Sequence, residues 1–121
     1  MAHPDIFGHI ADCWQDEYDK LAKELITAAN DCKVFLEFNA YGLRKPMKST
    51  SAGMKYQYPL IRFWEIASKM GVHAVIGMDS HAPEDVSSNW MQAYSMLRDI
   101  GIEPENQRME KIIQHQQENL I

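Results

Sequence analysis

Hydrophobic and polar positions alternate along this chain with two different periods. Three segments repeat apolar side chains every three to four residues, which is the period of a helix with one buried face: 16–30, 59–70 and 83–101. Between them, residues 33–40 and 72–78 are short apolar runs with the composition of buried strands. A polar helix with a thin apolar stripe is predicted over 105–120. The predicted order is helix, strand, helix, strand, helix, helix.

The segment 33–40 shows how its strand should be placed. Alternate side chains of a strand point to opposite faces, so Phe35, Glu37 and Asn39 share one face. The other face is wholly apolar, and we expect it to pack beneath a helix: Val34, Leu36 and Phe38. The segment 41–59 that follows is rich in turn-forming residues and reads as a long loop. The sequence leaves open whether 46–58 closes over a ligand.

Strands that alternate with helices are typical of an α/β fold with parallel strands joined by crossovers. Two strands are too few for a closed barrel, and a full (β/α) barrel takes about 250 residues. At 121 residues the chain is a single unit, 1–121, with 103–121 as its terminal polar helix. We therefore expect a partial (β/α) barrel, about the last half of one.

Composition limits the classes of function that fit. The 45% hydrophobic content is that of a globular protein, and no apolar run is long enough to span a membrane. No secretory signal is visible, and two cysteines without a Cys-x-x-Cys spacing, Cys13 and Cys32, indicate free thiols in a reducing cytoplasm. The formal net charge of -5 disfavours a nucleic-acid partner.

One basic cluster departs from this acidic balance. Four cations fall within twelve residues with no acidic residue among them: Arg44, Lys45, Lys48 and Lys55. Such a cluster can attract a small anion such as a phosphate ester, and a solvated surface loop explains it equally well.

The end of the second predicted strand carries the strongest chemical pattern. Asp79 and His81 stand two residues apart on an extended segment, so both side chains can reach one cation. Carboxylate and imidazole ligands suit zinc, manganese or iron. The alternative is helix capping, which accounts for Pro83 to Asp85 but does not require the two residues upstream.

Other candidates lie at matching places. The first strand ends in Glu37 and Asn39 and leads into Arg44, whose planar guanidinium suits phosphate oxygens. Functional side chains gather at the carboxyl ends of parallel strands, so these residues should share one edge with Asp79. In "AHPD", His3 is a further candidate ligand, with Asp5 capping or orienting the turn.

Three stretches in this order resemble the carboxyl-terminal half of the polymerase and histidinol phosphatase (PHP) family, closest to its histidinol-phosphatase branch: "AHPDIF", "LEFNAYGLRKP" and "YP…FWEIASKMGVHAVIGMDSHAPEDV". The resemblance covers about residues 1–101, and "GLRKP" and "GMDSHAPEDV" are its most specific parts. It implies a distorted β/α barrel whose mouth holds up to three divalent metal ions. It also implies hydrolysis of L-histidinol phosphate in histidine biosynthesis.

By the same resemblance, His3, Asp79 and His81 would be metal ligands. Arg44 would bind the substrate phosphate, while Glu37 and Asn39 would line the substrate site. The metals would activate a water for in-line attack on phosphorus, and Asp79 or His81 would also move a proton.

The chain also departs from the family, whose members carry a His-x-His strand and further ligands before the HPD segment. Those motifs do not occur in this sequence. We therefore expect part of a longer enzyme, with strand edges that favour self-association. Two alternatives stay open: a phosphoesterase of the same family acting on another phosphate ester, and a non-catalytic binding or assembly module.

Overall fold

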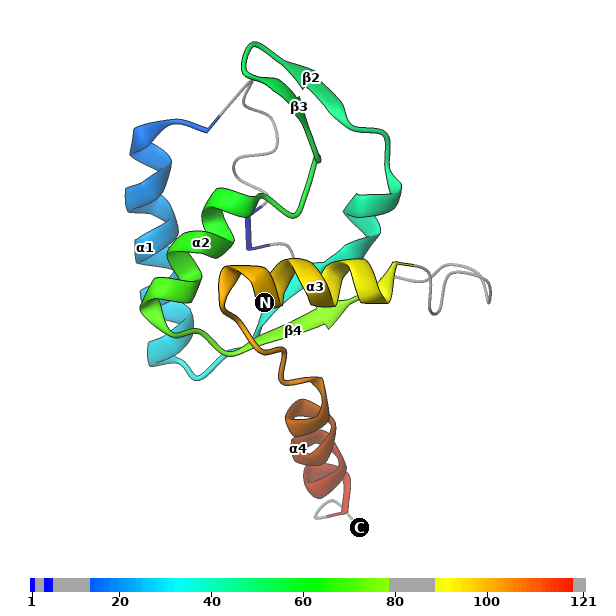
Figure 1. The fold of residues 1–121 in the computed structure, drawn as a ribbon. Helices are drawn as coiled ribbons and strands as arrows, with labels where there is room; N and C mark the ends of the chain where they lie inside the picture. Colours follow the sequence, from blue (N-terminus) through cyan, green and yellow to red (C-terminus); the bar gives the residue numbers. More distant parts are fainter. Residues whose placement is uncertain (2–3, 6–13, 79–88, 119–121) are drawn as a thin grey trace.

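The computed structural model describes residues 1, 4–5, 14–78 and 89–118, which form a small α/β protein (Figure 1). The described helices are α1 (Asp16–Asp31), the 3-10 helix η2 (Ala40–Arg44), α2 (Ile61–Met70), α3 (Trp90–Ile100) and α4 (Asn106–Glu118). The strands are β1 (Leu36–Asn39), β2 (Lys48–Thr50), β3 (Gly53–Lys55) and β4 (Ala74–Gly77). None of the described helices is long and apolar enough to cross a membrane.

The predicted parallel pair is confirmed. β1 and β4 lie side by side in parallel, with Leu36 opposite Ala74 and Asn39 opposite Gly77, and α2 lies in the connection between them. Both strands are shorter than predicted. Lys33 takes a left-handed φ of 56°, which a strand does not accommodate. The described residues close no barrel, so the prediction of half a barrel goes beyond what they contain.

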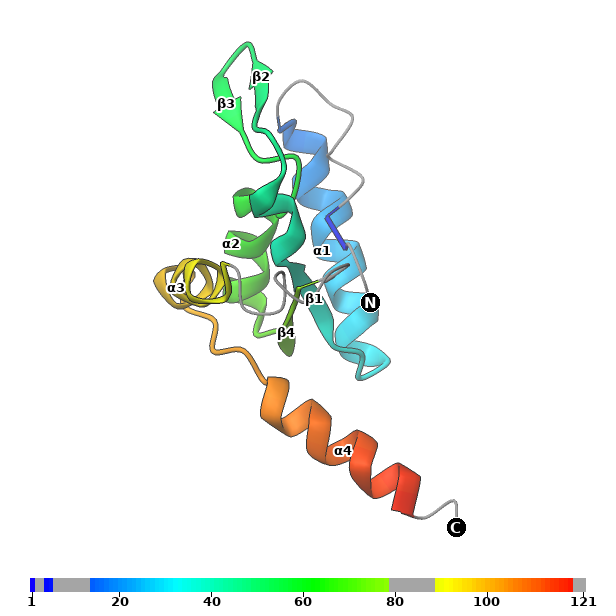
Figure 2. The ribbon, with the colours of Figure 1, turned by 90° about the vertical axis from the view of Figure 1, so that its right-hand side faces the viewer.

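The long loop predicted over 41–59 is wrong, because this segment holds η2 and the antiparallel hairpin of β2 and β3. The hairpin strands have three residues each and are largely exposed, so no apolar alternation marks them in the sequence. Thr50 stabilises the turn by accepting from the Ala52 N–H (3.1 Å) and donating to the Gly53 carbonyl (2.5 Å). Figure 2 shows the hairpin standing away from the parallel pair.

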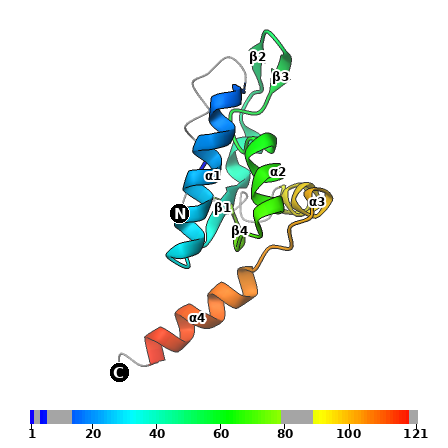
Figure 3. The ribbon, with the colours of Figure 1, turned by 90° about the vertical axis from the view of Figure 1, so that its left-hand side faces the viewer.

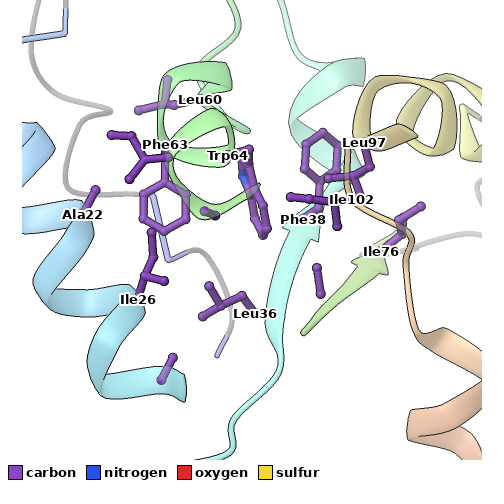
Figure 4. Close-up of a cluster of buried hydrophobic side chains, with 14 of the residues drawn as sticks. Ala22, Ile26, Leu36, Phe38, Leu60, Phe63, Trp64, Ile76, Leu97 and Ile102 are labelled. Atoms are coloured by element: carbon purple, nitrogen blue, oxygen red, sulfur yellow. The ribbon is translucent and has the colours of Figure 1, made fainter. Parts of the chain in front are cut away.

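The core lies between the parallel pair and the helices α1, α2 and α3 (Figure 4). Phe38 and Phe63 both meet the Trp64 ring edge-on, with centroids 5.3 and 5.4 Å apart. The apolar face predicted for the first strand is confirmed at Leu36 and Phe38, which are fully buried. It is wrong at Val34, which precedes β1 and is exposed.

The apolar stripe of α1 is turned slightly from the predicted one. Ile26 and Ala29 are buried as expected, but Leu21 is 47% exposed while Ala22 is fully buried. α1 packs against α2 (Figure 3), and the small Ala22 side chain allows the two helices to approach closely. At this turn of α1, the small size of Ala22 and its position facing α2 therefore decided which residue is buried, rather than the greater hydrophobicity of Leu21.

The predicted helix ends at glycine are confirmed. Gly71 and Gly101 follow α2 and α3 with left-handed φ angles of 72° and 102°. The predicted starts are less accurate: α2 begins at Ile61 rather than Pro59, and Asn89 lies just before α3 with a left-handed φ of 55°. The start predicted at Pro83 lies outside the described residues.

Both edges of the parallel pair have hydrogen-bond partners. On the β1 side, the Met1 amino group donates to the Phe35 carbonyl (2.5 Å) and the Met1 carbonyl accepts from the Glu37 N–H (2.9 Å). On the β4 side, Glu105 and Asn106 bind the backbone of Ala74 and Ile76. Self-association through strand edges stays a prediction, and a partner strand would have to displace these contacts.

Candidate functional site

The carboxyl end of β1 carries a preorganised pair of polar side chains. Asn39 donates from Nδ2 to Oε1 of Glu37 over 2.8 Å, and its Oδ1 accepts from the Tyr41 N–H over 3.0 Å. Asn39 is almost fully buried, and as the N-cap residue of η2 it fixes the direction in which the chain leaves the strand. Its amide therefore holds the Glu37 carboxylate in one orientation.

The Glu37 carboxylate lies over the neighbouring strand at Gly77. A Cβ atom at position 77 would stand 2.2 Å from Oε2 of Glu37, well inside van der Waals contact. Any side chain at position 77 would therefore require the Glu37 side chain to move. Glu37 and Asn39 are thus brought together at the end of the parallel pair, as the sequence predicts.

Arg44 joins this group from the end of η2. Its Nη2 donates to the Met78 carbonyl over 2.9 Å, a contact between residues 34 positions apart. Its guanidinium carbon lies 4.6 Å from the centroid of the Tyr41 ring. Stacking and hydrogen bonding together restrict the plane of the guanidinium.

The basic cluster predicted from the sequence divides into two parts. Lys45 stays near Arg44, with Nζ 5.3 Å from the Tyr41 ring centroid and 5.1 Å from that of Tyr58. Lys48 and Lys55 face each other across the hairpin instead.

Gly42 explains how the "GLRKP" turn fits against the rest of the chain. A Cβ at this position would lie 1.9 Å from the Tyr58 carbonyl oxygen, so η2 can pack here only with glycine. This contact also brings Tyr58 close to Lys45.

Asp79 and His81 lie outside the described residues, but the described residues that flank 79–88 both contact η2. Arg44 binds the carbonyl of Met78, and Asn89 donates from Nδ2 to the Ala40 carbonyl over 2.7 Å. Met78 and Asn89 are thus both held by η2, which directly follows Asn39 in the chain.

His3 also lies outside the described residues, whereas its neighbours Met1 and Asp5 do not. The two hydrogen bonds between Met1 and β1 have the pattern of a parallel bridge opposite Leu36. Asp5 is 2% exposed, and its Oδ2 accepts from the Leu60 N–H over 2.5 Å at the start of α2.

Asp5 therefore caps a distant helix, which goes beyond the local turn that the sequence suggested. α2 has no acidic residue in its first turn and no side-chain cap of its own at Leu60. The lack of a local cap at the start of α2 was the only sign in the sequence that a carboxylate from a distant segment would bind there.

No group of three or more His, Cys, Asp or Glu side chains suited to one metal ion occurs within residues 1, 4–5, 14–78 and 89–118. Glu37 provides a carboxylate at this site. It belongs to β1, and its side chain lies against Gly77 of β4. His73 precedes β4, at the opposite end of the strand, where its Nδ1 lies 2.7 Å from Oε2 of Glu105.

A separate apolar pocket of about 390 Å³ lies between the hairpin and the start of α2. Trp14, Met54 and Pro59 are among its lining residues, whereas Glu37, Asn39 and Arg44, the predicted site residues that the structure describes, are not. The hairpin therefore borders a pocket other than the strand-end site.

Comparisons of the chain with protein-family models, with characterised proteins and with solved structures find no match. The resemblance to the PHP family consequently rests on the motifs quoted above.

Proposed function

We propose that the chain supplies part of the active site of a metal-dependent phosphatase of the PHP type, acting on L-histidinol phosphate. One observation carries the proposal. Arg44 of "GLRKP" donates to the carbonyl of Met78, the residue directly before Asp79-Ser80-His81. The two most specific motifs of the resemblance thus meet at the carboxyl end of parallel strands, where β/α enzymes place their active sites.

In this proposal Arg44 binds the phosphate of the substrate. A planar guanidinium can contact two phosphate oxygens at once, and its orientation is set by the Tyr41 ring and the Met78 carbonyl. A donor whose plane is fixed before substrate arrives loses little entropy on binding. Glu37 and Asn39 line the same edge and orient the substrate's polar part.

The divalent ions would be held by His3, Asp79 and His81, with further ligands contributed by a segment that the family carries before the HPD motif. The donor set fits zinc, manganese or iron, since it combines imidazole and carboxylate groups. Bound there, the metal would acidify a water and neutralise phosphate charge. Asp5 would hold the segment that carries His3, through its contact to Leu60.

Two other functions remain candidates. The same chemistry on another phosphate ester needs only a different contact to the leaving group, and the net charge of -5 makes a short ester a better candidate than a long nucleic acid. A non-catalytic module would retain the fold and the Arg44 contact without binding metal.

The test uses this chain, alone and in any longer polypeptide that contains it. Metal content is measured by elemental analysis, and phosphate release is measured with histidinol phosphate, mononucleotides and p-nitrophenyl phosphate. Asp79→Ala/His81→Ala should lower the bound metal. Arg44→Ala should keep the metal and lower kcat/KM about 100-fold, since a charge-assisted contact to the transferred group is lost.

Arg98→Ala is the matched control. Arg98 also stacks over a tyrosine, with its guanidinium carbon 5.6 Å from the Tyr94 ring centroid, but it lies on α3 away from the strand ends. We expect its kcat/KM to change less than about threefold. Equal losses in both arginine variants, or hydrolysis that survives loss of Asp79 and His81, would contradict the proposed roles. Preference for a mononucleotide would favour the second candidate, and a metal-free, inactive polypeptide would favour the third.

A further inference from the structure

The pocket between the hairpin and the start of α2 is a concave surface that the strand-end site does not use. Its volume of about 390 Å³ lies within the range of small-molecule sites, roughly 300–1,000 Å³. Pro59 and Leu60 line it as buried residues. Met47, Met54 and Ile61 also line it, although they are 43%, 60% and 37% exposed. Large apolar side chains that gather in contact with water around a concavity are typical of ligand-binding grooves.

Hydrogen bonds hold the hairpin side of this pocket in place. Gln57 donates from Nε2 to the Pro46 carbonyl over 3.3 Å, which joins the two ends of the hairpin. Gln92 of α3 donates from Nε2 to the hydroxyl of Tyr56, a lining residue, over 3.3 Å. The pocket is thus formed before a ligand binds, and a preformed site loses little conformational entropy on binding.

The charges at the pocket favour an anion. Among the described lining residues two are basic, Lys55 and Arg62, and none is acidic. In the hairpin Lys55 stands directly opposite Lys48, and like charges in this position destabilise a pair of strands. An anion bound at Lys55 would offset this repulsion. The Arg62 charge is shared with Asp19 over 2.8 Å, and we therefore assign the anion to Lys55.

We propose that this pocket binds an amphiphilic carboxylate, a dissolved small molecule with one apolar chain and one anionic end. The chain contacts the apolar lining from Trp14 to Ile61, and Lys55 binds the carboxylate. Met47 and Met54 suit such a ligand, because the flexible methionine side chain adapts to the shape of an apolar partner. This binding function gives a role to the part of the basic cluster that does not accompany Arg44, and it is independent of the proposed phosphatase reaction.

The experiment titrates the full chain, labelled with ¹³C at its methionine methyl groups, with decanoate, octanoate and decylammonium below their micellar concentrations. In NMR spectra the Met47 and Met54 signals should shift, but not the signal of Met70 at the other end of α2. Decanoate should bind roughly tenfold more tightly than octanoate, because each buried methylene strengthens binding about three- to fourfold. Decylammonium has the same chain and the opposite charge, so it should bind more weakly than decanoate.

Single substitutions separate the two parts of the site. Lys55→Gln should weaken decanoate binding about two- to fivefold without weakening decylammonium binding, whereas Lys69→Gln, an exposed lysine at the end of α2, should change neither. Met54→Gln should weaken the binding of both ligands, because apolar contact is lost. Ile112→Gln is its control, on an exposed apolar residue of α4.

Unshifted Met47 and Met54 signals overturn the proposal, as do equal affinities of the wild-type chain for decanoate and decylammonium. A loss of decanoate binding in Lys69→Gln as large as in Lys55→Gln overturns it too, since net charge would then explain the preference. Binding to anionic phospholipid vesicles without binding of dissolved decanoate would indicate a membrane surface and would likewise overturn it. Chain-length and charge dependence are both measured on the wild-type chain, so the decision does not require that every variant folds.

Discussion

At the scale of single residues, the end of the parallel pair is organised by a glycine as much as by polar groups. Gly77 makes room for the Glu37 carboxylate, and Asn39 holds that carboxylate from its own strand. The carboxylate thus lies over β4 without a side chain beneath it. The position of Glu37 depends on the absence of a methyl group on the adjacent strand.

This dependence can be measured with Gly77→Ala. The added Cβ would overlap the Glu37 carboxylate, so we expect the free energy of unfolding to fall by about 1–3 kcal/mol, the usual cost of overpacking. Chemical denaturation with circular dichroism provides the measurement. The double variant Glu37→Ala/Gly77→Ala should recover much of the loss, because the shortened side chain vacates the space. A double variant as unstable as Gly77→Ala would contradict the proposed contact.

At the scale of elements, α1 and α2 are joined by one charged contact. Asp19 accepts from Arg62 through Nη2 (2.8 Å) and Nε (3.3 Å) and from Nε1 of Trp14 (2.8 Å). Hydrogen bonds from Arg62 and then from Trp14 lower the pKa of Asp19 below its usual value of 3.8. The ionised carboxylate is therefore more favourable in the folded chain than in the unfolded one.

The sign of the pH effect follows from this shift. A carboxyl group with a lowered pKa in the folded state stabilises the fold above its unfolded pKa, and this contribution disappears as the pH falls through the folded value. Asp19→Asn should therefore destabilise the chain at pH 7 and have a smaller effect near pH 3. Because the groups are exposed to solvent, the difference should be small and should shrink in high salt.

Urea unfolding at the two pH values tests this, with Glu24→Gln as a control that removes one negative charge elsewhere on α1. A penalty for Asp19→Asn that is the same at both pH values would show that the contact does not act through ionisation.

At the scale of the whole molecule, α4 differs from the other helices because it extends away from the body (Figure 1, Figure 2). Its described side chains beyond Asn106 are exposed, including the apolar Ile112. Among the described side chains of α4, Asn106 binds the body through the backbone of Ile76.

Ending the chain after Gln107 tests this arrangement. We expect a melting temperature close to that of the full chain and a monomer, since Asn106 is retained. Ending the chain after Pro104 should instead expose the edge of β4, lower the melting temperature and promote association. Thermal unfolding and sedimentation velocity measure the two effects. A large loss of stability in the longer of the two truncated chains would show that α4 packs on the body through more than Asn106.

The sequence determined those features that depend on neighbouring residues. The apolar periods of 16–30 and 59–70 indicated two helices, and Gly71 and Gly101 marked helix ends. The spacing of apolar residues along a helix and the backbone conformation at its end depend on residues that are neighbours in the chain. Both can therefore be predicted from one sequence.

Only the tertiary structure decided the contacts between distant segments. The short, exposed hairpin has no apolar pattern, and the roles of Asp5 at Leu60, Arg44 at Met78 and Asn106 at Ile76 join residues 30 or more positions apart. Each of these contacts is made to a backbone group, which is the same in every residue. The sequence carries no sign of which backbone group will be near, so such partners become known only once the chain has folded.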